Sequence, residues 1–308
     1  MSPLSLSLLA YIALAQNVAA LFVPPVPPPM VQNVHPLGFN SSLIHPLGVN
    51  DTVPDITVWN ATEHLSNVTS ILPSLPRRGQ RNDDKRLIVG SDDRTYNAET
   101  TYPYAAVGKL TWSNGVWCSG AMVGARHVLT ARHCLPTQDD VSGTFTPGFN
   151  NGAPFGSGQV ELAVIGASGQ GACETKADWA VLLINQRLGE RVGSFGLAYP
   201  SRSSFDQPRM IHQAYPGDRD DGQRPQRHLN TTVYSRNSLD CDSTGPIYSD
   251  TDTAGGQSGG PIWEMRSNGP FIWGALSISV SSQMYVYAGW ASGNDMVDAT
   301  MWLRSEYP

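Results

Sequence analysis

The 308-residue sequence is poor in charged residues and has no basic excess. It contains 20 Lys and Arg residues against 26 Asp and Glu residues, which gives a net charge of −6. Nucleic acids and anionic membrane surfaces are bound by clustered positive charge, which this composition does not supply. We therefore expect neither a nucleic-acid partner nor binding to a charged membrane surface.

Long apolar runs are also absent after the start of the chain. The one near the start, Leu4 to Leu14, is followed by the small residues Val18, Ala19 and Ala20. A run of about eleven residues is too short for a membrane helix, which needs roughly 20, but it fits the core of a signal peptide. We expect residues 1–20 to be a signal peptide and the protein to be secreted without a membrane anchor.

Cysteine is scarce, with 4 residues in the whole chain. An even number in a secreted protein favours two disulfides. A hairpin that turns near Gly124 to His127 would place Cys118 and Cys134 within about one residue of facing each other, which permits a bridge. Elimination then pairs Cys173 with Cys241, although three connectivities are formally possible. Because bridges would use all the cysteines and no histidine cluster has ligand spacing, we expect no metal and no cofactor.

Residues 21–86 differ in composition from the rest of the chain. They contain a proline cluster, Pro24 to Pro29, and a near-repeat of His-Pro-Leu-Gly-x-Asn that begins at His35 and again at His45. Candidate N-glycosylation sites lie at Asn40, Asn50, Asn60 and Asn67, with one more downstream at Asn230. The segment ends in basic pairs, Arg77-Arg78 and Lys85-Arg86. Such a composition favours an extended, solvated chain. We interpret it as a glycosylated propeptide, the alternative being a permanent stalk.

From Leu87 onward, short β-prone runs alternate with clusters of Gly, Asn, Asp and Pro. The runs expected to form strands are Tyr104 to Trp112, Trp117 to Val123, Val128 to Ala131, Val160 to Ile165, Trp179 to Ile184, Met210 to Tyr215, Pro261 to Glu264, Phe271 to Val280 and Tyr285 to Ala288. Many short strands at this spacing indicate a β-sandwich or a barrel. Near the C-terminus, Asn294 or Asp295 can cap a helix in which Val297 and Met301 share a face.

One serine lies among four glycines in the segment Asp252 to Pro261, which reads Asp-Thr-Ala-Gly-Gly-Gln-Ser-Gly-Gly-Pro. Glycine lacks a Cβ, so the backbone can approach another group closely and adopt a positive φ. A hydroxyl beside several free backbone N–H groups is what acyl transfer requires, because the N–H groups can stabilise an oxyanion. The segment alone is equally compatible with a glycine-rich surface turn.

Chain order selects among the serine-hydrolase scaffolds that could use Ser258. The candidate base is His133, which lies next to a cysteine at a strand end, and the candidate acid is Asp178 at the head of an apolar run. An α/β-hydrolase needs a histidine after its serine, but no histidine follows His228. A subtilisin-like order needs an acid before the base, and Asp92 and Asp93 lead no apolar strand. The remaining order is His, Asp, Ser, as in chymotrypsin-like proteases.

The motifs around these residues resemble the trypsin/chymotrypsin superfamily. They are Thr-Ala-x-His-Cys at His133, Asp-x-Ala-x-Leu at Asp178 and Gly-x-Ser-Gly-Gly-Pro at Ser258. Within that superfamily, the sequence resembles the glutamyl endopeptidase branch of bacterial enzymes and fungal secreted relatives. The segments that carry this likeness are 88–95, 102–104, 215–218 and 252–259, and the likeness covers roughly residues 87–308.

This resemblance implies an all-β fold of two antiparallel six-stranded β-barrels with a short C-terminal helix. Residues 87–190 would form the N-terminal barrel with His133 and Asp178, and residues 191–308 the C-terminal barrel with Ser258. It also implies a secreted serine endopeptidase, made as a proenzyme, with these three residues catalytic. The backbone N–H groups of Gly256 and Ser258 would form the oxyanion hole. We expect the mature protein to be a monomer acting on protein or peptide substrates.

Two of the departures from the family pattern concern activation and specificity. Gln257 stands where trypsin-like zymogens carry an aspartate that pairs with a newly freed α-amino group, and a neutral amide cannot form that ion pair. The glutamyl endopeptidases are thought to recognise glutamate partly through a histidine after the serine, but the segment Gly274 to Ser279 contains none. A preference for glutamate therefore does not carry over. The candidate substrate-binding residues are Asp252, Thr253, Ser277 and Ser279.

A protease homologue without activity, binding partners through its cleft, is the alternative. Loss of one of the three catalytic residues would be its usual signature, and all three are present.

Overall fold

The computed structural model describes residues 54–59, 92–137, 140–281 and 286–308. The predicted signal peptide, most of the predicted propeptide, the sequons at Asn40, Asn50, Asn60 and Asn67, and the expected mature N-terminus at Leu87 lie outside these residues. Among the described helices, none is long and apolar enough to cross a membrane.

Six strands of the first half of the chain close into a barrel. They are β3 (Val107–Trp112), β4 (Trp117–Met122), β5 (His127–Ala131), β6 (Gly143–Pro147), β7 (Gly158–Ile165) and β8 (Trp179–Ile184). The sheet runs β7-β6-β3-β4-β5-β8, and an additional pairing of β7 with β8 closes it. All strand pairs within the barrel are antiparallel.

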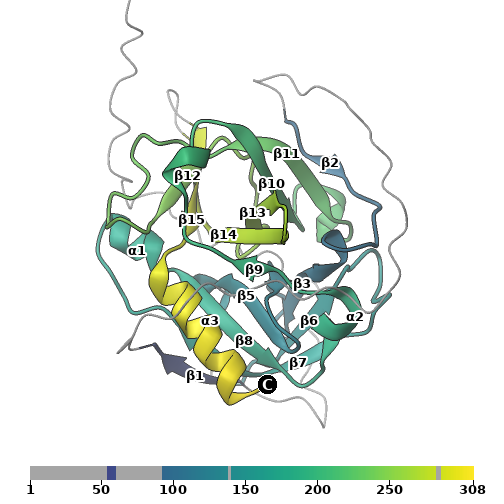
Figure 1. Ribbon diagram of the computed structural model, residues 1–308. Helices are drawn as coiled ribbons and strands as arrows, with labels where there is room; N and C mark the ends of the chain where they lie inside the picture. The colour runs from purple at the N-terminus through teal and green to yellow at the C-terminus, as the bar shows by residue number, and fades with distance from the viewer. Residues whose placement is uncertain (1–53, 60–91, 138–139, 282–285) are drawn as a thin grey trace, which may run out of the picture.

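The second half forms a similar sheet, which lies beside the first barrel in Figure 1. Its strands are β10 (Pro208–Ala214), β11 (Gln226–Thr232), β12 (Ile247–Ser249), β13 (Pro261–Arg266), β14 (Gly269–Ser281) and β15 (Val286–Ala291). The order is β12-β15-β14-β13-β10-β11. The two ends meet through an isolated bridge between Val233 and Ser249 and through a few hydrogen bonds, such as Tyr234 N–H to Tyr248 O and Asp250 N–H to Thr232 O, so this barrel closes less regularly. The predicted all-β, chymotrypsin-like fold is confirmed.

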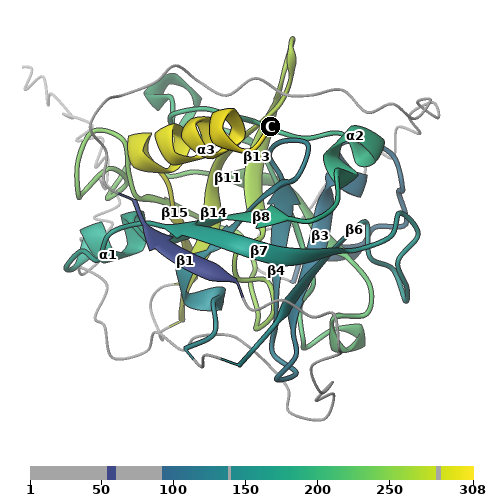
Figure 2. The ribbon, with the colours of Figure 1, turned by 90° about the horizontal axis from the view of Figure 1, so that it is seen from below.

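Three segments cross between the two halves or extend them. Strand β2 (Thr95–Tyr96) joins the second sheet at the edge of β11, and β9 (Gly196–Leu197) pairs with β14. Helix α3 (Asn294–Glu306), although it follows the second sheet, packs on β8 and β5 of the first barrel (Figure 2). The C-terminal helix thus covers the outer surface of the N-terminal barrel.

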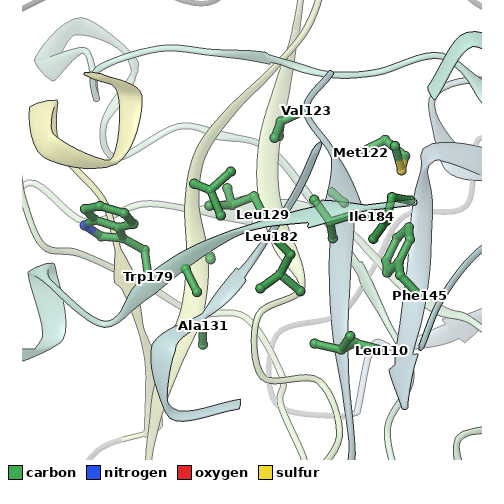
Figure 3. Close-up of a cluster of buried hydrophobic side chains, with 14 of the residues drawn as sticks. Leu110, Met122, Val123, Leu129, Ala131, Phe145, Trp179, Leu182 and Ile184 are labelled. Carbon is green, nitrogen blue, oxygen red and sulfur yellow. The ribbon is translucent and has the colours of Figure 1, made fainter. Parts of the chain in front are cut away.

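The first barrel contains the larger apolar core. Leu110, Met122, Leu129, Phe145 and Leu182 are fully buried and come from five different strands (Figure 3). Strand β8 is buried along its whole length instead of alternating. Successive side chains of a strand point to opposite faces, so one set fills the barrel while the other is covered from outside. This explains the continuous apolar run after Asp178.

Both predicted disulfides are present. Cys118 and Cys134 join β4 to the residues after β5 with a Cα–Cα separation of 6.1 Å. Cys173, in the short helix α1 (Ala172–Lys176), joins Cys241 in the second half of the chain at 4.9 Å. The remaining helix, α2 (Leu188–Val192), lies in the connection between the two sheets.

One local expectation was wrong. Helix α3 begins at Asn294, its N-cap is Gly293, and no side chain caps it. The side-chain oxygen of Asn294 instead accepts hydrogen bonds from Lys176 Nζ at 3.3 Å and Thr244 Oγ1 at 3.0 Å. The residue therefore connects α3 to the end of α1 and to the loop at Thr244, a use that a local capping rule does not consider.

One segment of the predicted propeptide contacts the barrel. Strand β1 (Asp55–Val58) pairs in parallel with β7, in register Asp55 to Leu162, and its side chains are exposed (Figure 2). The next residue, Trp59, donates its N–H to Ile165 O at 2.8 Å and packs on Trp302 of α3, with ring centroids 5.6 Å apart. This part of the segment is attached to the protease fold mainly through its backbone.

Two buried histidines predict a loss of stability in mild acid. Burial, together with the positive charge of Arg304, lowers the pKa of His127 to about 4. Burial lowers the pKa of His212 to about 3. Below roughly pH 6.5 the unfolded chain therefore binds protons that the native protein does not, so the free energy of unfolding falls as the pH falls.

We expect each histidine to reduce the free energy of unfolding by about 1–2 kcal/mol between pH 7 and pH 5. Urea unfolding at the two pH values measures this loss, and the His127→Gln variant should lose less than the parent protein. An equal loss in both proteins would contradict the assignment to His127.

Candidate active site

The geometry of His133 and Asp178 follows from the pairing of β5 with β8. Ala131 at the end of β5 faces Trp179 at the start of β8, so the residues just beyond each strand end lie together. The Arg132 N–H donates to Asp178 O at 3.1 Å, and the His133 N–H donates to Asp178 Oδ1 at 2.9 Å. The backbone thus holds both residues before their side chains interact.

The side chains form a second, shorter contact. His133 Nδ1 lies 2.6 Å from Asp178 Oδ2, and Ser277 Oγ donates to the same oxygen at 2.6 Å. A carboxylate only accepts hydrogen bonds, so Nδ1 carries the proton and Nε2 of the neutral ring is free to accept one. Nε2 is buried and has no hydrogen-bond partner among the described residues. The ring is therefore oriented as a base.

Ser258 reaches the same region because Gly259 lies directly against the first barrel. Gly259 has a φ of +76°, and a Cβ there would lie 2.1 Å from Thr130 Oγ1 and 2.7 Å from Ala131 N, just before His133 in the chain. The Ser119 N–H donates to Ser258 O at 2.8 Å. The hydroxyl of Ser258 is buried and, within the described part of the chain, has no partner. A buried polar group without a partner needs an explanation, and a catalytic role is one.

Two backbone N–H groups of the glycine-rich loop, those of Gly256 and Ser258, have no hydrogen-bond partner among the described residues. Gly255 O accepts from Gly217 N–H at 2.6 Å, and Gln257 O accepts from Gly260 N–H at 2.9 Å. In a trans peptide the N–H points away from the preceding C=O. The N–H groups of Gly256 and Ser258 therefore point away from these partners, and neither is hydrogen-bonded to any described residue.

Side chains of strand β4 hold the glycine-rich loop in place. Ser119 Oγ donates to Gly256 O at 2.9 Å and accepts from Tyr215 N–H at 2.9 Å. Trp117 Nε1 donates to Tyr215 O at 3.0 Å, and a Cβ on Gly256, which has a φ of +90°, would lie 2.5 Å from that nitrogen. A glycine is required here because a larger residue would push the loop away from β4.

The structure separates the four candidate substrate-binding residues. Ser277 is buried and bonds to Asp178, so it belongs with the histidine and the acid. The hydroxyls of Thr253 and Ser279 lie 2.5 Å apart. Asp252 Oδ2 accepts the Asp93 N–H at 2.8 Å.

Asn230 is exposed on β11 and stays a predicted glycosylation site.

Asp93, His228 and Asp252 are the one group with metal-ligand potential found in the described residues, their ligand atoms lying within 4.8 Å of one another. His228 Nδ1, however, accepts the Asp252 N–H at 3.1 Å, and Asp252 Oδ2 accepts the Asp93 N–H. Two of the three ligand atoms thus already have hydrogen-bond donors. We assign no metal to them.

Sequence reasoning did not single out Arg94. It lies in the segment 88–95 that carries part of the family resemblance, but nothing local indicates that its side chain reaches Gln257, which it does at 2.9 Å. The two residues are 163 positions apart in the chain, so no local pattern could have revealed the contact.

Because Gly259 lies so close to β5, we expect a marked loss of stability when one methyl group is added to it. We expect Gly259→Ala to lower the free energy of unfolding by about 1–3 kcal/mol through backbone strain alone, with more from displacing Thr130. Gly152→Ala is the matched control, because a Cβ there meets nothing within 4 Å. Urea unfolding of both variants tests this, and equal stability would contradict the packing described.

Comparisons with known proteins show the family and the fold of the chain. Residues 88–294 match the family model described as Trypsin. The chain is 34% identical over 212 residues to the glutamyl endopeptidase of Bacillus licheniformis, covering 66% of this chain and 63% of that protein. It is 28% identical over 206 residues to the extracellular metalloprotease of Bacillus subtilis, covering 61% of each. The matched region thus spans less than two thirds of either relative. A solved Glu endopeptidase in complex with MPD has a TM-score of 0.58 at 22% identity, covering 71% of this chain and 100% of that one, which indicates a shared fold.

Proposed function

Because the chain belongs to the trypsin family, we propose that it is a secreted serine endopeptidase that cleaves peptide bonds through an acyl-enzyme on Ser258. The observation that carries this proposal is the pair of unpartnered buried atoms, His133 Nε2 and Ser258 Oγ. One belongs to a ring oriented as a base, and the other lies in a loop packed against the strand that leads to that ring.

In the proposed reaction, Ser258 Oγ attacks the carbonyl carbon of the scissile bond while His133 Nε2 takes its proton. The same nitrogen then donates that proton to the leaving amine, and water repeats the sequence to release the acyl group. Asp178 holds the ring orientation and stabilises the imidazolium. The Gly256 and Ser258 N–H groups receive the developing oxyanion, where one lost donor costs about 2.7–4 kcal/mol.

Ser277 has a supporting role in this scheme. Its hydroxyl donates to the Asp178 oxygen that also contacts His133 Nδ1. A hydrogen bond to a charged group contributes about 1.5–3 kcal/mol, and here it fixes the carboxylate against rotation. We therefore assign Ser277 to positioning of the acid instead of substrate recognition.

The substrates we propose are proteins or peptides. One relative is a glutamyl endopeptidase, but Leu276, Ser277 and their neighbours in β14 include no histidine. The residue before the cleaved bond is best read directly, by digesting a peptide library with the mature enzyme and sequencing the products.

Ser258→Ala should abolish casein cleavage, because the attacking hydroxyl is gone. The parent protein should react with a phosphonofluoridate and carry the adduct on Ser258, as read by peptide mass spectrometry. Ser203→Ala, at an exposed serine, is the matched control and should keep full activity. Retained proteolysis in Ser258→Ala would contradict the mechanism. Processed parent protein that neither cleaves casein nor takes the label would favour the inactive-homologue alternative.

We also propose that residues 1–20 are a signal peptide and 21–86 a propeptide. The support is the apolar N-terminal run, the basic pairs and the start of the family match at residue 88. Mass spectrometry of secreted, active protein should find an N-terminus near Leu87. Active protein whose N-terminus lies upstream of Lys85 would contradict the proenzyme proposal.

A further inference from the structure

Gln257 lies between the two N–H groups of the proposed oxyanion hole, and its side chain is fully buried. Its Oε1 accepts hydrogen bonds from Arg94 Nη1 at 2.9 Å and from Ala254 N–H at 2.7 Å. Its Nε2 lies 3.0 Å from His212 Nε2. The side chain that sets the shape of this loop thus contacts three different parts of the molecule.

The direction of each hydrogen bond in this network is determined. His212 Nδ1 lies 2.8 Å from Pro261 O, and a carbonyl only accepts, so Nδ1 carries the proton. Burial lowers the pKa of His212 to about 3, so the ring is neutral and its Nε2 accepts from the Gln257 amide. The amide oxygen must then face Arg94 and Ala254. The orientation of Gln257 is therefore fixed at both ends.

Arg94 is held as firmly as the amide that it contacts. Its side chain is 6% exposed and forms paired contacts with two carboxylates. Nε and Nη2 donate to Asp92 at 3.0 and 2.8 Å, and Nη1 and Nη2 donate to Asp218 at 2.9 and 2.6 Å. Arg219 also pairs with Asp92, at 2.6 Å. Although burial opposes the charge, the hydrogen bonds that Arg94 donates to Asp92 and Asp218 raise its pKa above the usual value.

We propose that Arg94 is a positioning residue that holds the Gly256–Ser258 loop in its active shape through Gln257. In trypsin-like enzymes activated by insertion, a freed α-amino group supplies the cation that orders this loop. Here the internal guanidinium takes that place, so the loop does not depend on a new N-terminus. An amide oxygen has two acceptor positions, and Arg94 and Ala254 fill both in Gln257.

This inference rests on the proposed function, and it adds a consequence for maturation. The groups that order the loop, Arg94, His212 and Ala254, are part of the chain before any cleavage near residue 86. Removal of the propeptide would therefore not be needed to build the oxyanion hole.

A double-mutant cycle tests the route from Arg94 to the loop. Arg94→Met, Gln257→Met and the double variant are compared by kcat, KM and affinity for a peptide boronate, whose tetrahedral adduct uses the oxyanion hole. We expect each single change to lower kcat about 10²–10³-fold with KM altered less than about threefold. Boronate affinity should fall with kcat, while affinity for a cleaved product peptide stays unchanged. In the double variant, the second change should add less than about threefold.

Two further variants separate positioning from general stability. Arg126→Met removes a different arginine, which is partly buried and pairs with a carboxylate, Glu161, on the first barrel, and should leave kcat and boronate affinity unchanged. Arg94→Lys keeps the charge but not the planar fork, and should recover part of the lost kcat. If Arg94→Met does not fold, Arg94→Lys carries the same comparison. Unchanged boronate affinity in the Arg94 variants that fold would overturn the proposal.

The α-amino group is tested separately by removing it from the mature chain through transamination. We expect kcat/KM to stay within about twofold of the untreated enzyme, because no step depends on that group, whereas a loss greater than tenfold would overturn the proposal. Failure of the proposed function looks different, because the parent protein would then not label at Ser258. A parent protein that labels while its Arg94 variants retain full kcat would refute only the inference about Arg94.

Discussion

The close approach of the glycine-rich loop to the first barrel is the contact on which the site depends. Gly256 and Gly259 both have positive φ values, and a Cβ on either would collide with β4 or β5. Because of this approach, Ser258 comes next to β5, the strand that leads to His133. Asp178 is placed beside His133 by a different contact, the antiparallel pairing of β5 with β8. Two backbone contacts thus bring these residues together before the side chains of His133, Asp178 and Ser258 take part.

Buried polar side chains then orient Asp178 and the Gly256–Ser258 loop, which the backbone contacts bring together. Ser277, from the second sheet, bonds to Asp178 of the first. Arg94, beside β2, reaches the loop through Gln257, with His212 of β10 on the other side of the amide. These buried polar groups are hydrogen-bonded, which is the condition for placing them inside a protein at low cost. The contact of Ser277 with Asp178 also joins the two sheets, so the position of the acid depends on how the barrels pack together.

Much of the fold could be read from local pattern. The short β-prone runs at regular spacing, interrupted by Gly and Pro clusters, predicted an all-β protein, and the hairpin turn near Gly124 predicted the Cys118–Cys134 bridge. The continuous apolar run from Trp179 predicted a strand, and the structure adds that α3 covers its outer side. The capping prediction for α3 was wrong because Asn294 is used by Lys176 and Thr244, which lie far away in sequence.

The sequence by itself determined which class of serine-hydrolase scaffold its motifs fit, because residue types and their order along the chain exclude the other scaffolds without reference to space. A histidine, then an aspartate, then a serine among glycines left one arrangement of serine hydrolase. Only the tertiary structure decided how those groups are held. Ser277 bonds to Asp178, and Arg94 contacts the glycine-rich loop through Gln257. The tertiary structure also placed β1 along the edge of β7. Such contacts join residues about a hundred or more positions apart. The spacing of apolar residues along a strand indicates which face of the strand is buried, but not which distant residue that face contacts.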